Sequence, residues 1–86
     1  MTLSFTTQGW DSYCAWRTDA RTLKRIHQLI ADIERNGNSG IGKPERLSGD
    51  WSGWWSRHID EKNRLIYRLT ERGIEIAQCG GHYADR

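Results

Sequence analysis

The sequence is poor in cysteine and has no long hydrophobic run, and each shortage excludes a class of protein. Cys14 and Cys79 are the two cysteines; they stand far apart and belong to no Cys-x-x-Cys pattern. A redox dithiol is therefore not expected, and both residues are typical of small apolar fillers in a reducing compartment. No segment approaches the roughly 20 apolar residues of a membrane span, and the N-terminus has no basic region followed by an apolar run. We expect a cytoplasmic protein that enters no membrane.

Metal ligands and excess charge are equally scarce. No cluster of His, Cys and Asp has the spacing of metal ligands, so the sequence implies neither a metal nor another cofactor. The 13 basic and 11 acidic residues leave a net charge of +2, too small for the field of the whole molecule to drive tight RNA binding. Local clustering must supply any such affinity. A single stretch holds Arg57, His58, Lys62, Arg64, Arg68 and Arg72, which can also be ordinary surface charges of a solvated hairpin.

The hydrophobic pattern predicts an α+β fold in a single domain, residues 1–86. Alternating residues near the N-terminus indicate a short strand, and a first helix follows, capped by Thr7 and weakened by Gly9. A stronger helix begins after Asp19 and ends at Asn36-Gly37, because apolar residues recur between them at three- and four-residue spacing. Later strands are predicted around 45–47, 54–59, 64–70 and 74–79. Tight connections join them, so we expect an antiparallel sheet on which the N-terminal strand and both helices pack.

The register of the predicted hairpin decides which side chains share a face of the sheet. If Glu61 is the centre of its turn, His58 lies opposite Arg64. On the same face Ser56 and Trp54 then oppose Ile66 and Arg68. The other face carries Trp55, Ile59, Leu65, Tyr67 and Leu69. This register gives the helices an apolar side and collects cations on the opposite one.

Several short motifs, in order along nearly the whole chain, resemble one family. They are Trp10-Asp11-Ser12-Tyr13 followed by Trp16, the glycine-containing stretch from Gly40 to Glu45, Leu47, Ser52-Gly53-x-Trp55-Ser56-Arg57, Arg64-Leu65-x-Tyr67 and the terminal His82-Tyr83. In this combination the chain resembles the YoeB/Txe toxins of bacterial type II toxin–antitoxin modules, within the RelE superfamily. The resemblance implies a RelE-like fold and a ribosome-dependent endoribonuclease that cleaves messenger RNA in the ribosomal A site. It also implies neutralisation by a cognate, YefM-like antitoxin and formation of a homodimer.

The resemblance assigns catalysis to Glu45, Arg64, His82 and Tyr83. Cleavage without a metal needs a base for the ribose 2′-OH, cations for the charge of the phosphorane and an acid for the leaving 5′-oxygen. Glu45 suits the base, Arg64 the phosphate contact and His82 the acid. Tyr83 suits stacking on a base or a hydrogen bond to the phosphate. Each of the four also has an interpretation without a chemical role. Glu45 can be a solvated carboxylate after a proline, Arg64 an exposed hairpin arginine, His82 a surface residue and Tyr83 a packed C-terminal tyrosine.

Lys43, Arg57 and His58 are further candidates for binding the RNA backbone. His58 stands where the family often has a second arginine after Trp-Ser, and Ser48 replaces a lysine that often follows Pro-Glu-x-Leu. The chain also continues through Ala84-Asp85-Arg86, beyond the point at which many relatives stop. These departures place the family's phosphate contacts at His58 and Ser48 in question.

The closely spaced tryptophans allow two interpretations. Trp55 falls on the predicted core face and is expected to be structural, whereas Trp51 and Trp54 are candidates for stacking on RNA or for a protein interface.

Two alternatives to RNA cleavage also stay open. One is a domain that binds ribosomal or messenger RNA without cutting it, and the other is an interaction protein whose only partner is an antitoxin-like chain.

Overall fold

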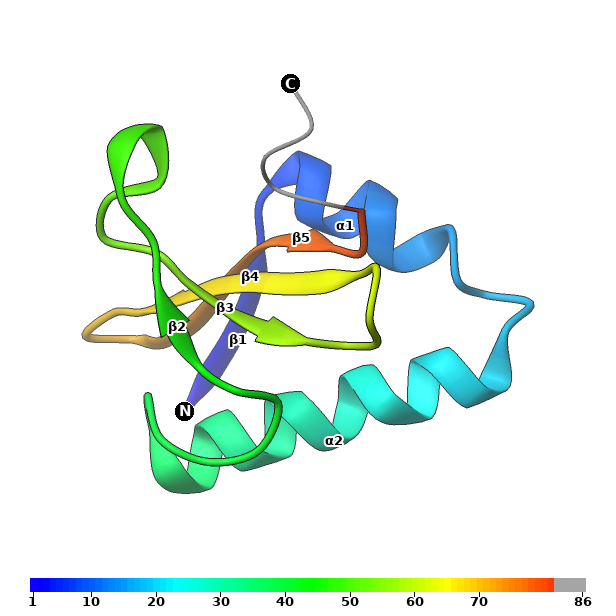
Figure 1. Cartoon of the computed structure of the whole chain (residues 1–86), viewed down its shortest axis with the longest axis horizontal. Coiled ribbons are helices and arrows are strands. Elements are labelled where there is room, and N and C mark those ends of the chain that lie inside the picture. Colours follow the sequence, from blue (N-terminus) through cyan, green and yellow to red (C-terminus); the bar gives the residue numbers. More distant parts are fainter. Residues whose placement is uncertain (82–86) are drawn as a thin grey trace.

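The computed structural model describes residues 1–81, and in this range two helices pack on a five-stranded sheet (Figure 1). The elements are β1 (Thr2–Phe5), α1 (Thr7–Cys14), α2 (Ala20–Asn36), β2 (Glu45–Arg46), a 3₁₀ turn (Gly49–Trp51), β3 (Trp55–His58), β4 (Arg64–Leu69) and β5 (Gly73–Cys79). The predicted α+β fold is confirmed, and the elements lie close to their expected bounds. No helix in the described part of the chain is long and apolar enough to cross a membrane.

β1 joins the sheet in a direction that the sequence did not reveal. The strand order is β1-β5-β4-β3-β2, and β1 pairs with β5 in parallel, from Thr2 opposite Gly73 to Phe5 opposite Ile76. The remaining strands pair antiparallel, as expected. The sheet is therefore mixed: the predicted antiparallel part is confirmed, and the N-terminal strand extends it in parallel. A parallel pair needs a long connection, which the chain between β1 and β5 provides, whereas tight turns join β3 to β4 and β4 to β5.

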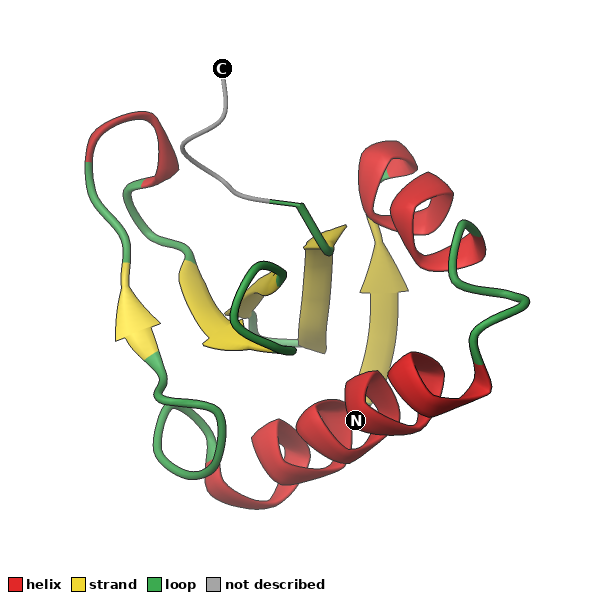
Figure 2. Cartoon of the chain, turned by 45° about the vertical axis from the view of Figure 1, so that its right-hand side comes forward, coloured by secondary structure: helices red, strands yellow, loops and turns green. Residues whose placement is uncertain are grey.

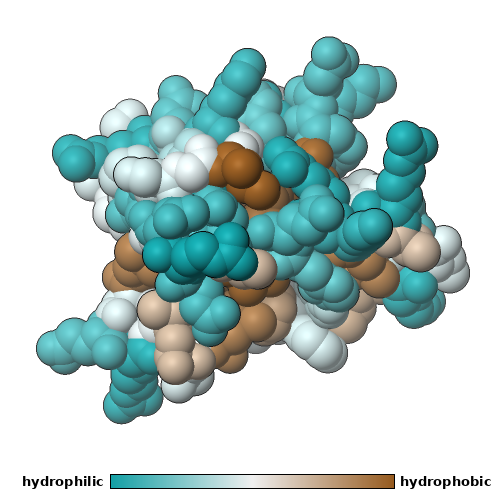
Figure 3. All heavy atoms as spheres, turned by 90° about the horizontal axis from the view of Figure 1, so that it is seen from below, coloured by the Kyte–Doolittle hydropathy of each residue, from teal (hydrophilic) through white to brown (hydrophobic). Residues whose placement is uncertain are grey.

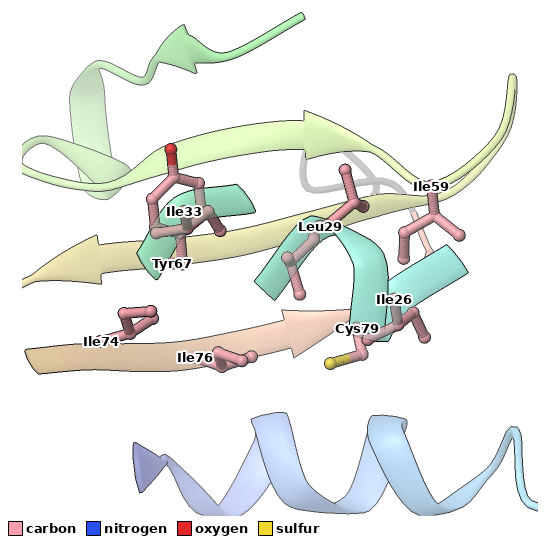
Figure 4. Packing of buried hydrophobic residues seen from close by; sticks show 9 residues of the cluster. Ile26, Leu29, Ile33, Ile59, Tyr67, Ile74, Ile76 and Cys79 are labelled. Atoms are coloured by element: carbon pink, nitrogen blue, oxygen red, sulfur yellow. The ribbon is translucent and has the colours of Figure 1, made fainter. Parts of the chain in front are cut away.

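α2 begins and ends where the sequence predicts. The side chain of Asp19 accepts a hydrogen bond from the backbone N–H of Thr22 at 3.0 Å, and Gly37 closes the helix with a φ of +66°. The buried side of the helix packs against one face of the sheet, as Figure 4 shows. This core contains Ile26, Leu29, Ile33, Ile59, Leu65, Tyr67, Ile74, Ile76 and Cys79. Seen from the side of α2, the outer surface is mostly hydrophilic with separate hydrophobic patches (Figure 3).

The predicted hairpin register is confirmed in β3 and β4, where His58 pairs with Arg64 and Ser56 with Ile66. The ladder ends at the pair of Trp55 and Tyr67, so Trp54 lies before β3. Its ring still meets Arg68, whose guanidinium carbon is 4.5 Å from the ring centre. On the core face Ile59, Leu65 and Tyr67 are buried, but Leu69 is 39% exposed at the end of β4.

α1 lies beside the part of β5 that extends past β1, and Figure 2 shows it following directly from the end of β1. Thr6 is its N-cap, one residue before the predicted Thr7. The hydroxyl of Ser12 accepts from the backbone N–H of Cys79 at 2.9 Å, and the indole N–H of Trp16 donates to the Cys79 carbonyl at 2.8 Å. Side chains of this segment thus satisfy backbone groups of β5 that β1 is too short to reach.

Gly9 permits this close approach. It is buried, and a Cβ at its position would lie 2.2 Å from the carbonyl oxygen of Ile76. The sequence alone presented Gly9 as a weak point of the helix, because glycine in a helix interior costs about 0.5–1 kcal/mol relative to alanine. The structure shows that the missing side chain makes room for β5.

Both cysteines are free thiols. Cys79 belongs to the core, and its burial raises the pKa of the thiol to about 12. The side chain is therefore an uncharged apolar filler at neutral pH, as predicted. Cys14 is half-buried in α1.

Gly9→Ala should lower the free energy of unfolding by about 1–3 kcal/mol, because the added methyl group must push α1 away from β5. In an exposed helix the same change would stabilise the protein. Gln8→Ala, at the exposed neighbouring position, should change the value by less than about 0.5 kcal/mol. Urea denaturation of the three proteins measures both effects, and an equal or higher stability of Gly9→Ala would contradict the close packing.

Candidate active site

The face of the sheet opposite α2 brings together three of the predicted site residues. Glu45 on β2 pairs with Ser56 on β3, and His58 lies two residues further along β3, opposite Arg64 on β4. Paired residues and residues two apart on a strand point to the same side of a sheet. The carboxylate, the imidazole and the guanidinium therefore share one face, on three adjacent strands.

Glu45 and Lys43 are exposed beside each other on the segment that enters β2. Lys43 adopts a φ of +54°. Among residues 1–81, it is the only residue other than glycine that has a positive φ. This conformation is uncommon for a residue with a side chain and persists where neighbouring structure enforces it. Pro44 follows and restricts the entry into β2 further. The backbone before Glu45 is thus closely constrained although both charged side chains reach solvent.

The pKa of His58 depends on its burial and on the charges around it. Its pKa lies below the ordinary value, first because burial disfavours the imidazolium and then because Arg64 and Lys43 repel it. Glu45 acts in the opposite direction, and Arg25 adds a weaker repulsion. His58 is therefore mainly neutral at pH 7, so it can donate or accept a hydrogen bond but supplies no fixed positive charge where the family often has arginine.

Arg64 is held by the turn that precedes it. Its Nη1 donates to the carbonyl oxygens of Asp60, Glu61 and Asn63 at 3.1–3.4 Å. Asp60 in turn accepts from the backbone N–H of Asn63 at 2.7 Å, which closes the turn. Among the described residues Nε and Nη2 of Arg64 have no hydrogen-bond partner, so these two donors are available for a phosphate.

The last described residues run beside Arg64. The backbone N–H of Gly80 donates to the Arg64 carbonyl at 2.8 Å, and that of Arg64 donates to the Gly81 carbonyl at 3.2 Å. The N–H of Gly81 also donates to the side chain of Asn63 at 2.8 Å. His82 and Tyr83, the predicted acid and positioning residue, come next in the sequence and lie outside the described residues.

Arg57 does not face this site, and the prediction that it contacts RNA is wrong. Its side chain is fully buried on the α2 side of the sheet, between the positions of Trp55 and Ile59. It forms an ion pair with Asp32 of α2, which the sequence analysis had no reason to pair with it. Asp32 itself is 7% exposed, and the Arg57 guanidinium is the main reason that the pKa of its carboxyl lies below the usual range. The signal was the strand alternation, which places Arg57 on the apolar face.

The tryptophans are mostly structural. Trp55 packs against the main core, as predicted. Trp51 and Trp54 are half-buried on the site face, with their ring centres 5.8 Å apart, and cover a second small cluster. The buried members of that cluster are Leu47, Ile66 and Ala77. Trp10, by contrast, is 52% exposed on α1. Within residues 1–81, no group of three or more His, Cys, Asp or Glu side chains is placed to hold a metal ion.

A family model, curated sequences and solved structures that resemble this chain belong to bacterial toxins of one kind. Residues 5–83 match the family model of the YoeB-like toxin of bacterial type II toxin-antitoxin system. Toxin YoeB of Streptomyces coelicolor is 48% identical over 96% of this chain and 100% of its own length. The structure of a YoeB/ParE toxin from Agrobacterium tumefaciens is 44% identical, with a TM-score of 0.91 over 96% of this chain and all of that one. A heterotetrameric YoeB–YefM complex and a YoeB dimer from Staphylococcus aureus are each 35% identical over 96% of this chain and 98% of theirs, with TM-scores of 0.87 and 0.88.

The charges around His58 allow a direct test of the site geometry. Arg64→Gln and Lys43→Gln should each raise the pKa of His58, because each removes a repelling cation, whereas Glu45→Gln should lower it further. Arg72→Gln, in the distant β4–β5 turn, is the control and should leave it unchanged. NMR titration of the imidazole resonances, assigned with His58→Gln, measures these pKa values. If none of the three site substitutions changed the pKa of His58, the result would contradict the placement of these residues on one face of the sheet.

Proposed function

Because the chain belongs to the YoeB-like toxins of bacterial type II toxin–antitoxin systems, we propose that it is a ribosome-dependent endoribonuclease. It cleaves messenger RNA in the ribosomal A site and uses acid–base chemistry without a metal. The observation that carries this proposal is the shared face of Glu45, His58 and Arg64, which offers a carboxylate on β2 and a cation on β4, the two strands that flank β3. Such a pair is what attack by a ribose 2′-OH on its own phosphodiester requires.

In the proposed reaction Glu45 accepts the proton of the 2′-OH, and the resulting oxygen attacks the phosphorus. The 2′,3′-cyclic phosphate forms as the bond to the 5′-oxygen breaks. Arg64 uses Nε and Nη2, which have no hydrogen-bond partner among residues 1–81, to hold the phosphate oxygens, where charge grows in the transition state. Lys43 adds a second cation nearby, and His58 contributes as a neutral hydrogen-bonding group.

The acid of this reaction is proposed from the family resemblance. His82 protonates the leaving 5′-oxygen, and Tyr83 positions the scissile nucleotide by stacking or by a hydrogen bond to the phosphate. The support for this placement is the path of the chain: Gly80 and Gly81 are bonded to the backbone of Arg64 directly before His82 in the sequence. An imidazole with an ordinary pKa near 6.5 is partly protonated at neutral pH, as an acid of this kind must be.

We also propose that a cognate, YefM-like antitoxin neutralises the protein and that the protein forms a homodimer. Support comes from the similar YoeB of Staphylococcus aureus, whose solved structures include a complex with YefM and a dimer. A ribosomal substrate places the activity in the cytoplasm. Messenger RNA, the ribosome and the antitoxin are thus the proposed partners, and no membrane is involved.

The test is cell-free translation of a defined messenger RNA with mapping of the 3′ ends and with a chelator that spares the Mg²⁺ needed by the ribosome. Wild type should cut at ribosome-positioned codons. Glu45→Gln, Arg64→Gln and His82→Ala should each lower the cleavage rate by about 10²–10⁴-fold. They remove the proposed base, the phosphate contact and the acid, respectively. Arg72→Gln should cleave like wild type.

Two outcomes would contradict the enzyme. If wild type stopped translation and the messenger stayed intact, the protein would be a binder that occludes RNA without cutting it. If it neither cut nor stopped translation but still bound the antitoxin, it would be an interaction protein with a degenerate site. Naked messenger RNA, incubated without ribosomes, tests the ribosome dependence separately.

A further inference from the structure

The 37–42 loop joins α2 to the segment that enters β2, and the side chain of Arg57 binds three of its carbonyl groups. Nη2 of Arg57 donates to the carbonyl oxygens of Gly37 at 2.7 Å and Ser39 at 3.0 Å. Nη1 donates to the carbonyl oxygen of Ile41 at 3.0 Å. Three carbonyl groups of one short loop therefore accept hydrogen bonds from one guanidinium. These bonds satisfy backbone groups that a strand would pair with a neighbouring strand.

Arg57 can fix the loop because it is itself fixed. Its side chain has no exposed surface, Nη1 is paired with the carboxylate of Asp32, and Nε donates to the hydroxyl of Tyr67 at 3.3 Å. These contacts attach it to α2 and β4. The same Asp32 carboxylate accepts the backbone N–H of Ile41 at 3.1 Å. A planar group with five donors in a rigid fork suits this arrangement, and a lysine ammonium does not.

The held loop leads directly to Glu45. The Gly42 carbonyl accepts from the backbone N–H of His58 at 2.7 Å, and Lys43 and Pro44 are the only residues between Gly42 and Glu45. β2 contains two residues and lies at the edge of the described sheet, where β3 is its one paired strand. So short a ladder fixes little by itself, and the position of Glu45 depends on how the preceding loop is held.

We propose that Arg57 is a positioning residue for the reaction proposed above. It fastens the 37–42 loop to α2 and β4 and thereby sets where the Glu45 carboxylate lies relative to Arg64 on the opposite side of β3. This inference rests on the proposed nuclease function for its effect on rate, and on the structure alone for its effect on the loop. Arg57 touches no RNA in this role.

Such a role predicts a loss of turnover without a loss of binding. A displacement of a reacting group by about 1 Å can cost on the order of 10²-fold in rate. No cationic side chain available to contact RNA would be removed, and Arg64, which is held by the 60–63 turn, would keep its position. A loss through weaker ribosome binding would instead indicate that Arg57 supports the binding surface as a whole.

Two variants release the loop from different sides. Arg57→Lys keeps a charge for Asp32 but cannot reach the three loop carbonyls. Gly42→Ala keeps the Arg57 and Asp32 side chains but pushes the loop outward. The new Cβ would lie 2.8 Å from Leu29 Cδ2, 3.2 Å from Arg57 Cβ and 3.3 Å from the His58 carbonyl oxygen. This variant therefore serves as the test even if Arg57→Lys does not fold.

Gly53→Ala is the matched control for Gly42→Ala. Gly53 has a φ of +93° against +81° for Gly42, so an alanine is similarly strained at either position. Among residues 1–81, however, no atom outside residues 52–54 lies within 4 Å of a Cβ built at Gly53, so the control adds the strain without displacing the loop.

Single-turnover cleavage on saturating ribosome complexes, ribosome affinity and amide hydrogen exchange are the three measurements. Arg57→Lys and Gly42→Ala should each cleave about 10²-fold more slowly with unchanged affinity. Their amides between residues 38 and 46 should exchange faster while those of β4 and β5 do not. In the Glu45→Ala background, Arg57→Lys should slow cleavage no further, because its effect acts through Glu45. Gly53→Ala should match wild type in all three.

The inference is overturned if the rates stay at the wild-type value, if the loss persists in the Glu45→Ala background, or if affinity alone falls. Failure of the proposed function looks different: wild type itself would not cleave. In that case hydrogen exchange still decides the structural half, since faster exchange of the loop in Arg57→Lys supports the fastening and unchanged exchange refutes it.

Discussion

The ion pair between Arg57 and Asp32 is the interaction on which the arrangement of the molecule depends, because it lies where α2, β3 and the 37–42 loop meet. Burying two charges costs several kcal/mol per ion unless each finds complete hydrogen bonding. Here Arg57 also satisfies three loop carbonyls and the Tyr67 hydroxyl, and Asp32 accepts from Ile41 and Asn36. These hydrogen bonds offset the desolvation cost, and they also hold in place a segment that forms no regular structure.

Successive side chains of β3 point to opposite faces of the sheet, so neighbouring residues have different roles. Arg57 points toward α2 and serves the fold, whereas His58 points to the opposite face with Glu45 and Arg64. The two faces are coupled through the loop, whose backbone is bonded to Arg57 and to the N–H of His58 before it delivers Glu45. A core interaction can therefore govern the geometry of an exposed site without any contact to substrate.

Local signals in the sequence predicted α2 and the β3–β4 register well, since caps and alternation are properties of neighbouring residues. The direction of β1 was missed because pairing with β5 is decided by a connection of nearly the whole chain. Arg57 was misassigned because cations were grouped by closeness in sequence, although the same alternation that placed Trp55 in the core also placed Arg57 there. The exposed positions of Glu45 and Lys43 agree with their candidate roles, while His82 and Tyr83 fall outside the described residues.

The way α1 seals the free part of β5 leaves the described sheet with two open margins, the outer sides of β1 and β2. These margins are chemically unequal. A strand added beside β2 would run next to Glu45 and the proposed active site, whereas one added beside β1 would extend the sheet at its far end. A neighbouring chain can therefore continue the described sheet at either edge, and the edge at β2 is the one beside the proposed active site.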